Sequence, residues 1–347
     1  MAPASTNFET PSLIMLWRVF HIKKRKGKFM KIVFLYEHPT WSNTLIETFR
    51  SNGIDLELIN VADLSFHTAK GRPDFDFAVN RINMMPSSGR NSSIVFHTLH
   101  YLSWLESMGV IIVNGSQAHF AGASKALQNG LFTKLALHCP QAVAVYQAQD
   151  VLKAAKTIGF PLIIKPNIGG SGNGITRYNS YHELETAVKS NKVDLGIDGT
   201  GLVQEYIHSD GYVYRVEILG ERLFYSIKQK MMAHTFNYCA ADGCSVSQTP
   251  ENNDSSFEYC ALNQGNRIQP FEADEKIVAQ VISIIHNAGA DLGGVEYLMD
   301  TKTGKPCFYD FNPYSNFVSN GQALLGFSPE QRFVDYIKDI YSRRISN

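Results

Sequence analysis

The chain has 347 residues, of which 44% are hydrophobic, so it can bury more than one core and we expect one to three domains. Lys and Arg together number 32, as do Asp and Glu, which excludes a strong overall field that would attract nucleic acid or an anionic membrane. The five cysteines include no CxxC pair, which argues against a disulfide framework or a zinc site and favours reduced thiols in the cytoplasm. They are Cys139, Cys239, Cys244, Cys260 and Cys307.

The first 29 residues differ from the rest of the chain. Residues 13–20 are apolar apart from Arg18, and a basic run follows at residues 21–28. This apolar stretch is too short to span a bilayer, which takes about 20 residues, and a secretory signal carries its positive charge before the apolar stretch. We therefore interpret residues 1–29 as a disordered tail or a non-native upstream extension, with weak surface or membrane tethering as the alternative.

From Met30 onward, short apolar segments alternate with amphipathic ones. The pattern predicts two helices, and Gly53 and Gly109 mark their ends. The predicted strands are 31–36, 55–60, 75–80 and 110–114, and the predicted helices are 43–52 and 92–108. This alternation indicates a parallel sheet with helices on both faces, in which ligands bind beyond the carboxyl ends of the strands. Arg81 follows the third strand at that edge, where it could meet a substrate carboxylate or remain an ordinary surface arginine.

The middle of the chain contains the glycine-rich segment PLIIKPNIGGSGNGI at residues 161–175. The elements predicted before it are a helix at about 124–138, a strand at 142–146 and a helix at 150–158. Within the segment a short apolar strand ends at Lys165 and leads into four glycines in six positions, which are Gly169, Gly170, Gly172 and Gly174. Backbone N–H groups in such a loop can turn toward one anion, so the segment predicts a phosphate-binding loop. A glycine-rich hairpin tip or mobile loop is the alternative.

A second group of polar residues lies about 130 residues later. The elements predicted first are a strand at 201–207 and a hairpin at 212–219 and 223–228. Strands at 293–300 and 307–312 then flank a turn, and symmetry about Thr303 places Glu296 opposite Asp310. Asn312 shares the face of Asp310, so three oxygen ligands converge, which suits Mg²⁺ or Mn²⁺ at nucleotide phosphates. The alternative is a solvent-exposed hairpin face with ordinary charges.

Several motifs follow one another in a characteristic order. They are Asn114, Ser124-Lys125, IIKPNIGGSGNGI, VQEYI, Gly211-x-x-x-Arg215, Gly294-Val295-Glu296 and Tyr309-Asp310-Phe311-Asn312-Pro313. This order resembles the ATP-grasp superfamily, and within it the RimK-type and D-alanine–D-alanine-ligase-like branch of carboxylate–amine ligases. The resemblance implies an α/β and α+β fold. Its expected parts are an N-terminal Rossmann-like parallel-sheet domain at 30–115, a small central α+β lobe with the glycine loop at 116–203, and a C-terminal antiparallel-sheet lobe with the metal site at 204–347.

The resemblance also implies a role for each motif. Lys125 would contact the α and β phosphates of ATP, and Lys165 would be the second phosphate-binding lysine. Arg215 would steady the γ-phosphate or acyl phosphate, and Lys165 and Arg215 would be the catalytic residues. The loop residues over the γ-phosphate would be Gly169, Gly170, Ser171 and Gly172. The adenine-binding residues, acting partly through their backbone, would be Gln204, Glu205, Tyr206 and Ile207. The ligands of magnesium or manganese would be Glu296, Asp310 and Asn312.

The chain departs from the family pattern at several places. Val213 stands where related ligases carry an acid for the ribose, so Asp210 would serve instead or the ribose would be held differently. Glu296 and Asp310 exchange the usual lengths of the two metal carboxylates, and residues 313–317 replace the usual small-residue ending. We expect the insert at residues 231–267 to set substrate identity.

The implied reaction joins a carboxylate to an amine through an acyl phosphate and yields an amide, ADP and phosphate. Catalysis would consist mainly of neutralising phosphate oxygens and aligning the attacking carboxylate, without a protein nucleophile. The substrates would be small molecules, such as an amino acid or a peptide terminus, and family analogy allows a homo-oligomer. A small-molecule kinase that uses the same nucleotide site and a non-catalytic ATP-binding module are the alternatives.

Overall fold

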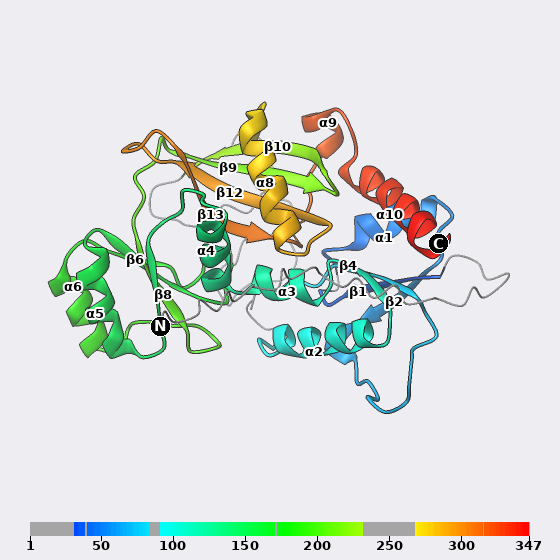
Figure 1. The fold of residues 1–347 in the computed structure, drawn as a ribbon, viewed down its shortest axis with the longest axis horizontal. Helices are drawn as coiled ribbons and strands as arrows, with labels where there is room; N and C mark the ends of the chain where they lie inside the picture. The colour runs from blue at the N-terminus through cyan, green and yellow to red at the C-terminus, as the bar shows by residue number, and fades with distance from the viewer. Residues whose placement is uncertain are drawn as a thin grey trace, which may run out of the picture.

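The computed structural model describes residues 31–38, 40–83, 91–170, 172–231, 268–314 and 316–346. These residues form a parallel four-stranded sheet, an antiparallel four-stranded sheet and an antiparallel five-stranded sheet, which confirms the predicted α/β and α+β class. The parallel sheet and the small antiparallel sheet lie at opposite ends of the molecule, with the five-stranded sheet above and between them (Figure 1). Among the helices of the described residues, none is both long and apolar enough to cross a membrane.

The N-terminal sheet is parallel, and its strands in order are β2 (Leu56–Asn60), β1 (Ile32–Tyr36), β3 (Phe77–Asn80) and β4 (Ile111–Val113). Alternate residues of β1 face opposite sides, so Phe34 joins the core beneath α1 (Asn43–Ser51) and Leu35 joins the core beneath α2 (Ile94–Ser107). A short 3₁₀ helix (Val61–Asp63) follows β2. The elements predicted for this part of the chain are confirmed, with ends that differ by one or two residues.

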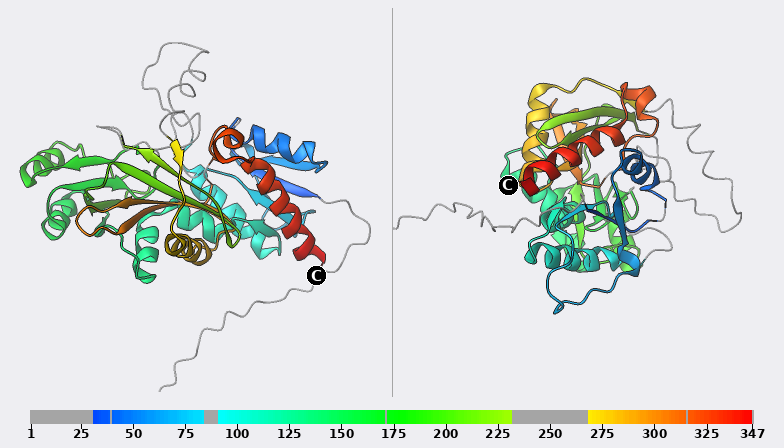
Figure 2. Two further views of the ribbon diagram at one scale, coloured as in Figure 1. Left: turned by 90° about the horizontal axis from the view of Figure 1, so that it is seen from above. Right: turned by 90° about the vertical axis from the view of Figure 1, so that its right-hand side faces the viewer.

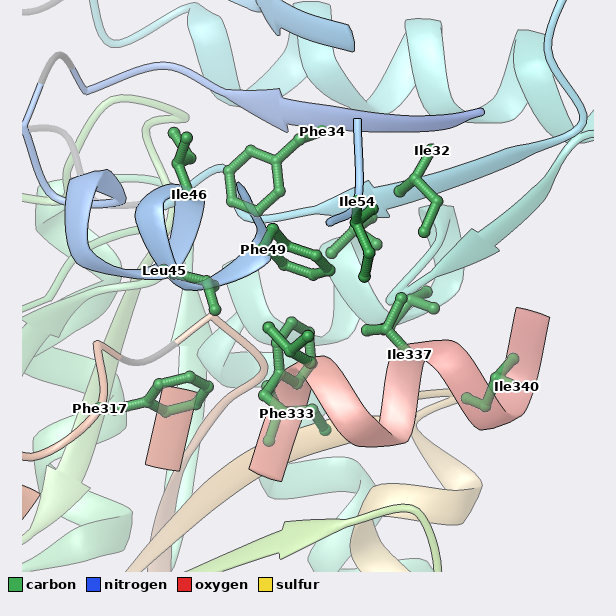
Figure 3. Packing of buried hydrophobic residues seen from close by; sticks show 14 of the residues in the cluster. Ile32, Phe34, Leu45, Ile46, Phe49, Ile54, Phe317, Phe333, Ile337 and Ile340 are labelled. Atoms are coloured by element: carbon green, nitrogen blue, oxygen red, sulfur yellow. The ribbon is translucent and has the colours of Figure 1, made fainter. Parts of the chain in front are cut away.

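The C-terminal helix α10 (Pro329–Ser346) returns to this N-terminal sheet and lies beside α1 (Figures 1 and 2). Phe333 and Ile337 of α10 point toward Phe49 of α1 and the nearby Ile54 (Figure 3). Fully burying a large apolar side chain contributes about 1.5–3 kcal/mol, so this contact ties the two ends of the described chain together.

The central lobe is the small antiparallel sheet, with strands in the order β5 (Ala142–Val145), β8 (Gly201–Glu205), β6 (Leu162–Pro166) and β7 (Thr176–Tyr178). The helices α5 (Ala148–Ile158) and α6 (Tyr181–Lys189) pack on it, and their shared core includes Val151, Leu184 and Val203. All of β6 is buried, so Lys165 reaches the end of the strand inside the protein.

The C-terminal lobe is the five-stranded antiparallel sheet. Its strands in order are β11 (Ile268–Pro270), β10 (Arg222–Lys230), β9 (Tyr212–Leu219), β12 (Leu292–Met299) and β13 (Pro306–Asn312). The helix α8 (Glu275–Asn287) packs on one face of this sheet, and α9 (Gly321–Leu325) follows β13 along the chain. The predicted hairpins β9–β10 and β12–β13 are confirmed.

Two short helices, α3 (Ser116–Ala123) and α4 (Lys125–Lys134), lead from the N-terminal sheet to the central lobe. The expected helix to residue 138 is too long, because Ala136 takes a left-handed conformation with φ +53° and ends it. Phe132 of α4 is buried with Val216 of β9, so α4 packs on the five-stranded sheet. Lys125 is therefore carried by the C-terminal lobe, whereas Lys165 is carried by the central lobe.

Asn114 joins the N-terminal sheet to the C-terminal lobe. It is buried in a left-handed conformation with φ +56° directly after β4. Its side-chain oxygen accepts bonds from the backbone of Asp291 at 2.8 Å and Leu292 at 3.1 Å, and its amide donates to the carbonyl of Pro313 at 2.6 Å. One side chain thus fixes both ends of the β12–β13 hairpin against β4.

Candidate active site

Two rows of side chains cross the middle of the five-stranded sheet. Glu296 of β12 lies between Arg215 of β9 and Asp310 of β13. Two residues along, Gly294 of β12 lies between Glu217 and Asn312. Residues two apart on a strand share a face, so all these side chains meet on one side of the sheet. The predicted opposition of Glu296 and Asp310 is confirmed, and Asn312 joins them as expected.

Gly294 makes room for a buried ion pair that links the two rows. The Arg215 Nε donates to Glu217 Oε1 at 2.7 Å, and both side chains are buried. A Cβ on Gly294 would lie 2.4 Å from Glu217 Oε1 and 2.8 Å from Arg215 Nε, closer than atoms can approach. The glycine of the Gly-Val-Glu motif is therefore required by the arginine on the neighbouring strand.

Each carboxylate of the first row faces a cation. Lys125 Nζ lies 2.6 Å from Asp310 Oδ1, and Arg215 Nη1 lies 3.6 Å from Glu296 Oε1. Burial by itself would raise the pKa of Asp310, but Lys125 holds it below its usual value. Burial raises the pKa of Glu296, and the charge of Asp310 adds to this while Arg215 opposes it. The phenol of Tyr309 also donates to Glu296 Oε2 at 2.6 Å.

Lys125 and Lys165 come from different lobes and meet at the same site. Burial, and then the nearby charge of Lys125, lower the pKa of Lys165 to about 7. Asp310 opposes this lowering, which places Lys165 close to the β13 carboxylate as well. Two lysines held together inside a protein form a site that favours an anion.

Asn167, two residues after Lys165, caps the helix that carries Lys125. Its side-chain oxygen accepts from the Ser124 hydroxyl at 3.0 Å and from the Ala126 N–H at 2.9 Å, and its carbonyl accepts from the Lys125 N–H at 3.1 Å. These bonds satisfy N–H groups that the first turn of α4 would otherwise leave unpaired. Asn167 thus sets the spacing between the two lysines.

The glycine loop follows β6 as predicted. Gly172 and Gly174 take left-handed conformations with φ +72° and +75°, whereas Gly169 and Gly170 do not. A Cβ on Gly174 would also lie 2.7 Å from the ring of Pro166, so this glycine allows the loop to fold back on β6. Ser171 lies outside the described residues, as does most of the insert at 231–267, including His234 and Asp242.

The segment expected to hold the adenine lies at the end of β8. Gln204 is buried, and the Glu205 carboxylate accepts a bond from the Gln141 N–H at 3.0 Å. The Tyr206 N–H donates to the carbonyl of Pro161 at 3.2 Å, so this N–H already has a protein partner. The Arg177 guanidinium lies 4.0 Å above the Tyr206 ring. Ile207, the last residue of this set, is half-buried.

Asp210 and Arg81 each have a defined setting. The Asp210 carboxylate accepts from the Tyr214 phenol at 2.6 Å and from the Tyr212 N–H at 3.1 Å, so both oxygens hold the start of β9. Arg81 is half-buried, with its guanidinium 5.0 Å from the centre of the Phe317 ring. Burial lowers the pKa of Arg81 to about 10.

The donor set suits a hard divalent cation. Glu296, Asp310 and Asn312 offer two carboxylates and an amide oxygen on one face of the hairpin. The Asn312 oxygen accepts from the Tyr314 N–H at 2.9 Å, which orients it and leaves its second lone pair free. No cluster of three His, Cys, Asp or Glu side chains suited to a metal occurs in the described part of the chain, so phosphate or water oxygens would complete the shell.

Sequence reasoning missed Glu217, Tyr309 and Asn167. Glu217 could have been found, because it lies two residues after Arg215 and so shares its face of β9. Tyr309 reaches Glu296 only because a bulge shifts the register between Glu296 and Tyr297, and nothing in the sequence marks that bulge. Asn167 carried no signal beyond its place in the glycine-rich segment.

Sequence comparisons found proteins similar to this chain. The family model described as "Carbamoyl-phosphate synthase L chain, ATP binding domain" matches residues 125–208, the stretch from Lys125 through β8. The glutamate–LysW ligase of Sulfurisphaera tokodaii is 26% identical over 328 residues, which cover 90% of this chain and 100% of that protein.

Solved structures share the fold over nearly the whole chain. A RimK domain ATP-grasp protein from Sphaerobacter thermophilus matches with a TM-score of 0.62 at 16% identity, covering 88% of this chain and 99% of that one. The VanG D-Ala:D-Ser ligase from Enterococcus faecalis matches with a TM-score of 0.63 at 16% identity, covering 90% and 100%. The similarity extends over all three sheets.

Proposed function

We propose that this chain, which belongs to the ATP-grasp superfamily, is an ATP- and magnesium-dependent ligase that joins a carboxylate to an amine. The reaction passes through an acyl phosphate and yields an amide, ADP and phosphate. One observation carries the proposal. The row formed by Arg215, Glu296 and Asp310 lies beside two lysines from different lobes, Lys125 and Lys165.

The charges at this site match the needs of phosphoryl transfer to a carboxylate. An attacking carboxylate must approach the terminal phosphate of ATP, so positive groups have to neutralise the phosphate oxygens. Lys125 and Lys165 would bind the phosphates, and Arg215 would steady the group in transfer. A divalent ion would add further neutralisation, with Glu296, Asp310 and Asn312 as its protein ligands.

Binding of ATP would rearrange the ion pairs of the site. Lys125 is paired with Asp310, so on binding the phosphates it would turn toward them and leave the Asp310 carboxylate to the metal site. The glycine loop would cover the phosphates and keep water from the acyl phosphate, since hydrolysis would waste the activated carboxyl group.

We propose amino acids or peptide termini as substrates. The relatives' names specify a glutamate, D-alanine and D-serine as the groups joined, which supports a carboxylate and an amine of that class. We also propose a cytoplasmic location, in line with the reduced thiols expected from the cysteine spacing.

Product analysis tests the proposal directly. The protein is incubated with ATP, Mg²⁺ and a panel of amino acids, and products are identified by mass spectrometry. A ligase yields ADP, phosphate and an amide, whereas ADP with a phosphoester would show a kinase, and no ATP consumption with any pair would show a binding module. We expect Asp310→Ala to abolish ATP consumption and Asp339→Ala, on the exposed face of α10, to retain it. If Asp310→Ala consumes ATP as fast as the wild type, the proposed metal site is wrong.

A further inference from the structure

The strand that carries two of the proposed metal ligands is an edge strand. Within the described residues, β13 is the last strand of the five-stranded sheet, with β12 as its neighbour. An edge strand presents backbone N–H and C=O groups that have no strand beside them, so its position is poorly determined unless another group pairs with it. Phe311 lies between Asp310 and Asn312 in this strand, so its backbone sets the spacing of the two ligands.

The side chain of Gln128 pairs with this backbone. Gln128 Oε1 accepts from the Phe311 N–H at 3.1 Å, and Gln128 Nε2 donates to the Phe311 carbonyl at 2.9 Å. A primary amide offers a donor and an acceptor side by side, as a strand residue does, so it replaces one residue of the missing strand. Gln128 is only 1% exposed, and its Nε2 also donates to the carbonyls of Ala121 and Gly122 at 3.2 and 2.9 Å.

The bulge in β13 makes this pairing possible. Glu296 pairs with Asp310 whereas Tyr297 pairs with Phe308, so Tyr309 is the extra residue of the bulge. Phe308 and Phe311, three residues apart, consequently both direct their N–H groups to the outer edge. The Phe308 N–H donates to the carbonyl of residue 138 at 2.9 Å, and the Phe311 N–H donates to Gln128.

Gln128 lies one turn after Lys125 in α4, and the two side chains hold consecutive residues of β13. Residues three apart in a helix share a face, so Lys125 contacts the Asp310 carboxylate while Gln128 contacts the Phe311 backbone. One turn of α4 therefore fixes the position of β13 relative to Lys125.

We propose that Gln128 is a positioning residue for the metal site, which holds Asp310 and Asn312 at the spacing that the cation requires. The inference rests on the proposed function only in taking these two residues as metal ligands. Gln128 touches neither substrate nor metal and acts through the Phe311 backbone.

Gln128→Met tests the inference, because methionine keeps the length of the side chain and removes both hydrogen bonds to Phe311, together with those to the carbonyls of Ala121 and Gly122. We expect the Mg²⁺ concentration for half-maximal ATP consumption to rise about tenfold, as for lost contacts behind a metal ligand, while kcat at saturating Mg²⁺ falls less. Gln128→Glu keeps one acceptor but turns an anion toward three carbonyls, so a larger rise is expected. Gln331→Met is the matched control, since the Gln331 amide pairs with Asn52 beside α10, away from the site.

Two readouts need no catalysis. Mn²⁺ binding in the presence of ADP, followed by electron paramagnetic resonance, should weaken about tenfold in Gln128→Met and stay unchanged in Gln331→Met. In the ligand-free wild-type protein, hydrogen exchange at the Phe311 amide should be as slow as within β9, although β13 is an edge strand. Rapid exchange at that amide, or equal Mn²⁺ affinity in Gln128→Met and wild type, overturns the inference. If the protein binds Mn²⁺ and ADP but forms no amide, the proposed ligase function is refuted. The role of Gln128 is then still decided by the Mn²⁺ affinity of Gln128→Met compared with that of the wild type.

Discussion

Replacing Gly294 by alanine should damage the active site through one methyl group. The new Cβ would lie 2.4 Å from Glu217 Oε1 and 2.8 Å from Arg215 Nε, so the ion pair must move by several tenths of an ångström or more. Gly294 has no positive φ angle, so the backbone accepts alanine and the clash is the whole effect. Both neighbours are buried among packed strands and have little room to yield.

The size of the effect follows from this geometry. Forcing one extra carbon into a packed site costs about 1–3 kcal/mol, and separating the buried pair would raise the cost to about 3–5 kcal/mol. Displacing a group that steadies the reacting phosphate by about 1 Å can lower the rate by about 10²-fold. We therefore expect Gly294→Ala to lower both the melting temperature and kcat.

Thermal unfolding and steady-state kinetics measure the two effects, with Gly130→Ala as the control. Gly130 is exposed within α4 and has no atom within 4 Å of an added Cβ, so alanine there should stabilise the helix by about 0.5–1 kcal/mol and leave kcat unchanged. If Gly294→Ala melts at the wild-type temperature and retains its kcat, the described packing of Arg215 and Glu217 is wrong.

Three further predictions concern protons at the site. Burial and the charge of Lys125 lower the pKa of Lys165 to about 7, and phosphates would restore its charge, so ATP binding at pH 8 should take up a proton. Calorimetry in buffers of different ionisation enthalpy measures this uptake, and its absence would contradict the described burial. In the unfolded chain Lys165 stays protonated to a higher pH than in the folded protein. The cost of burying its charge therefore lowers the free energy of unfolding below about pH 7, and this cost declines as the pH rises toward 10. Lys165→Met should remove this pH dependence. Tyr309→Phe removes a 2.6 Å hydrogen bond to Glu296 and should therefore raise the already raised pKa of Glu296 further. The acid limb of the pH–rate profile should shift to higher pH, and the Mg²⁺ concentration for half-maximal activity should rise about tenfold. An unchanged acid limb would show that Glu296 is not at the site.

Local patterns in the sequence predicted much of the fold and the relative places of Glu296, Asp310 and Asn312 on the β12–β13 hairpin. Side chains alternate across a strand with a period of two, so the place of Asn312 beside Asp310 could be read directly. The turn between β12 and β13 sets their register, which brought Glu296 opposite Asp310. The apolar run before Lys165 predicted β6, and the glycines after it predicted the loop.

Only the tertiary structure decided which groups meet from distant parts of the chain. Lys125 and Asp310 are 185 residues apart in the sequence. They meet because Phe132 packs α4 against the five-stranded sheet. Gln128 reads as an ordinary helix residue until α4 docks on the edge of that sheet. The bulge at Tyr309 likewise leaves no mark in the sequence.

The division has a physical reason. Strand alternation and turn geometry are determined by neighbouring residues and by steric limits on the backbone, so they can be read from a short window of sequence. The contacts of Lys125, Gln128 and Glu217 are determined by how whole elements pack, and packing is the sum of many weak interactions between residues far apart in the chain. The sequence by itself therefore determined the strands and the order of the motifs, and the tertiary structure decided how their charges are paired.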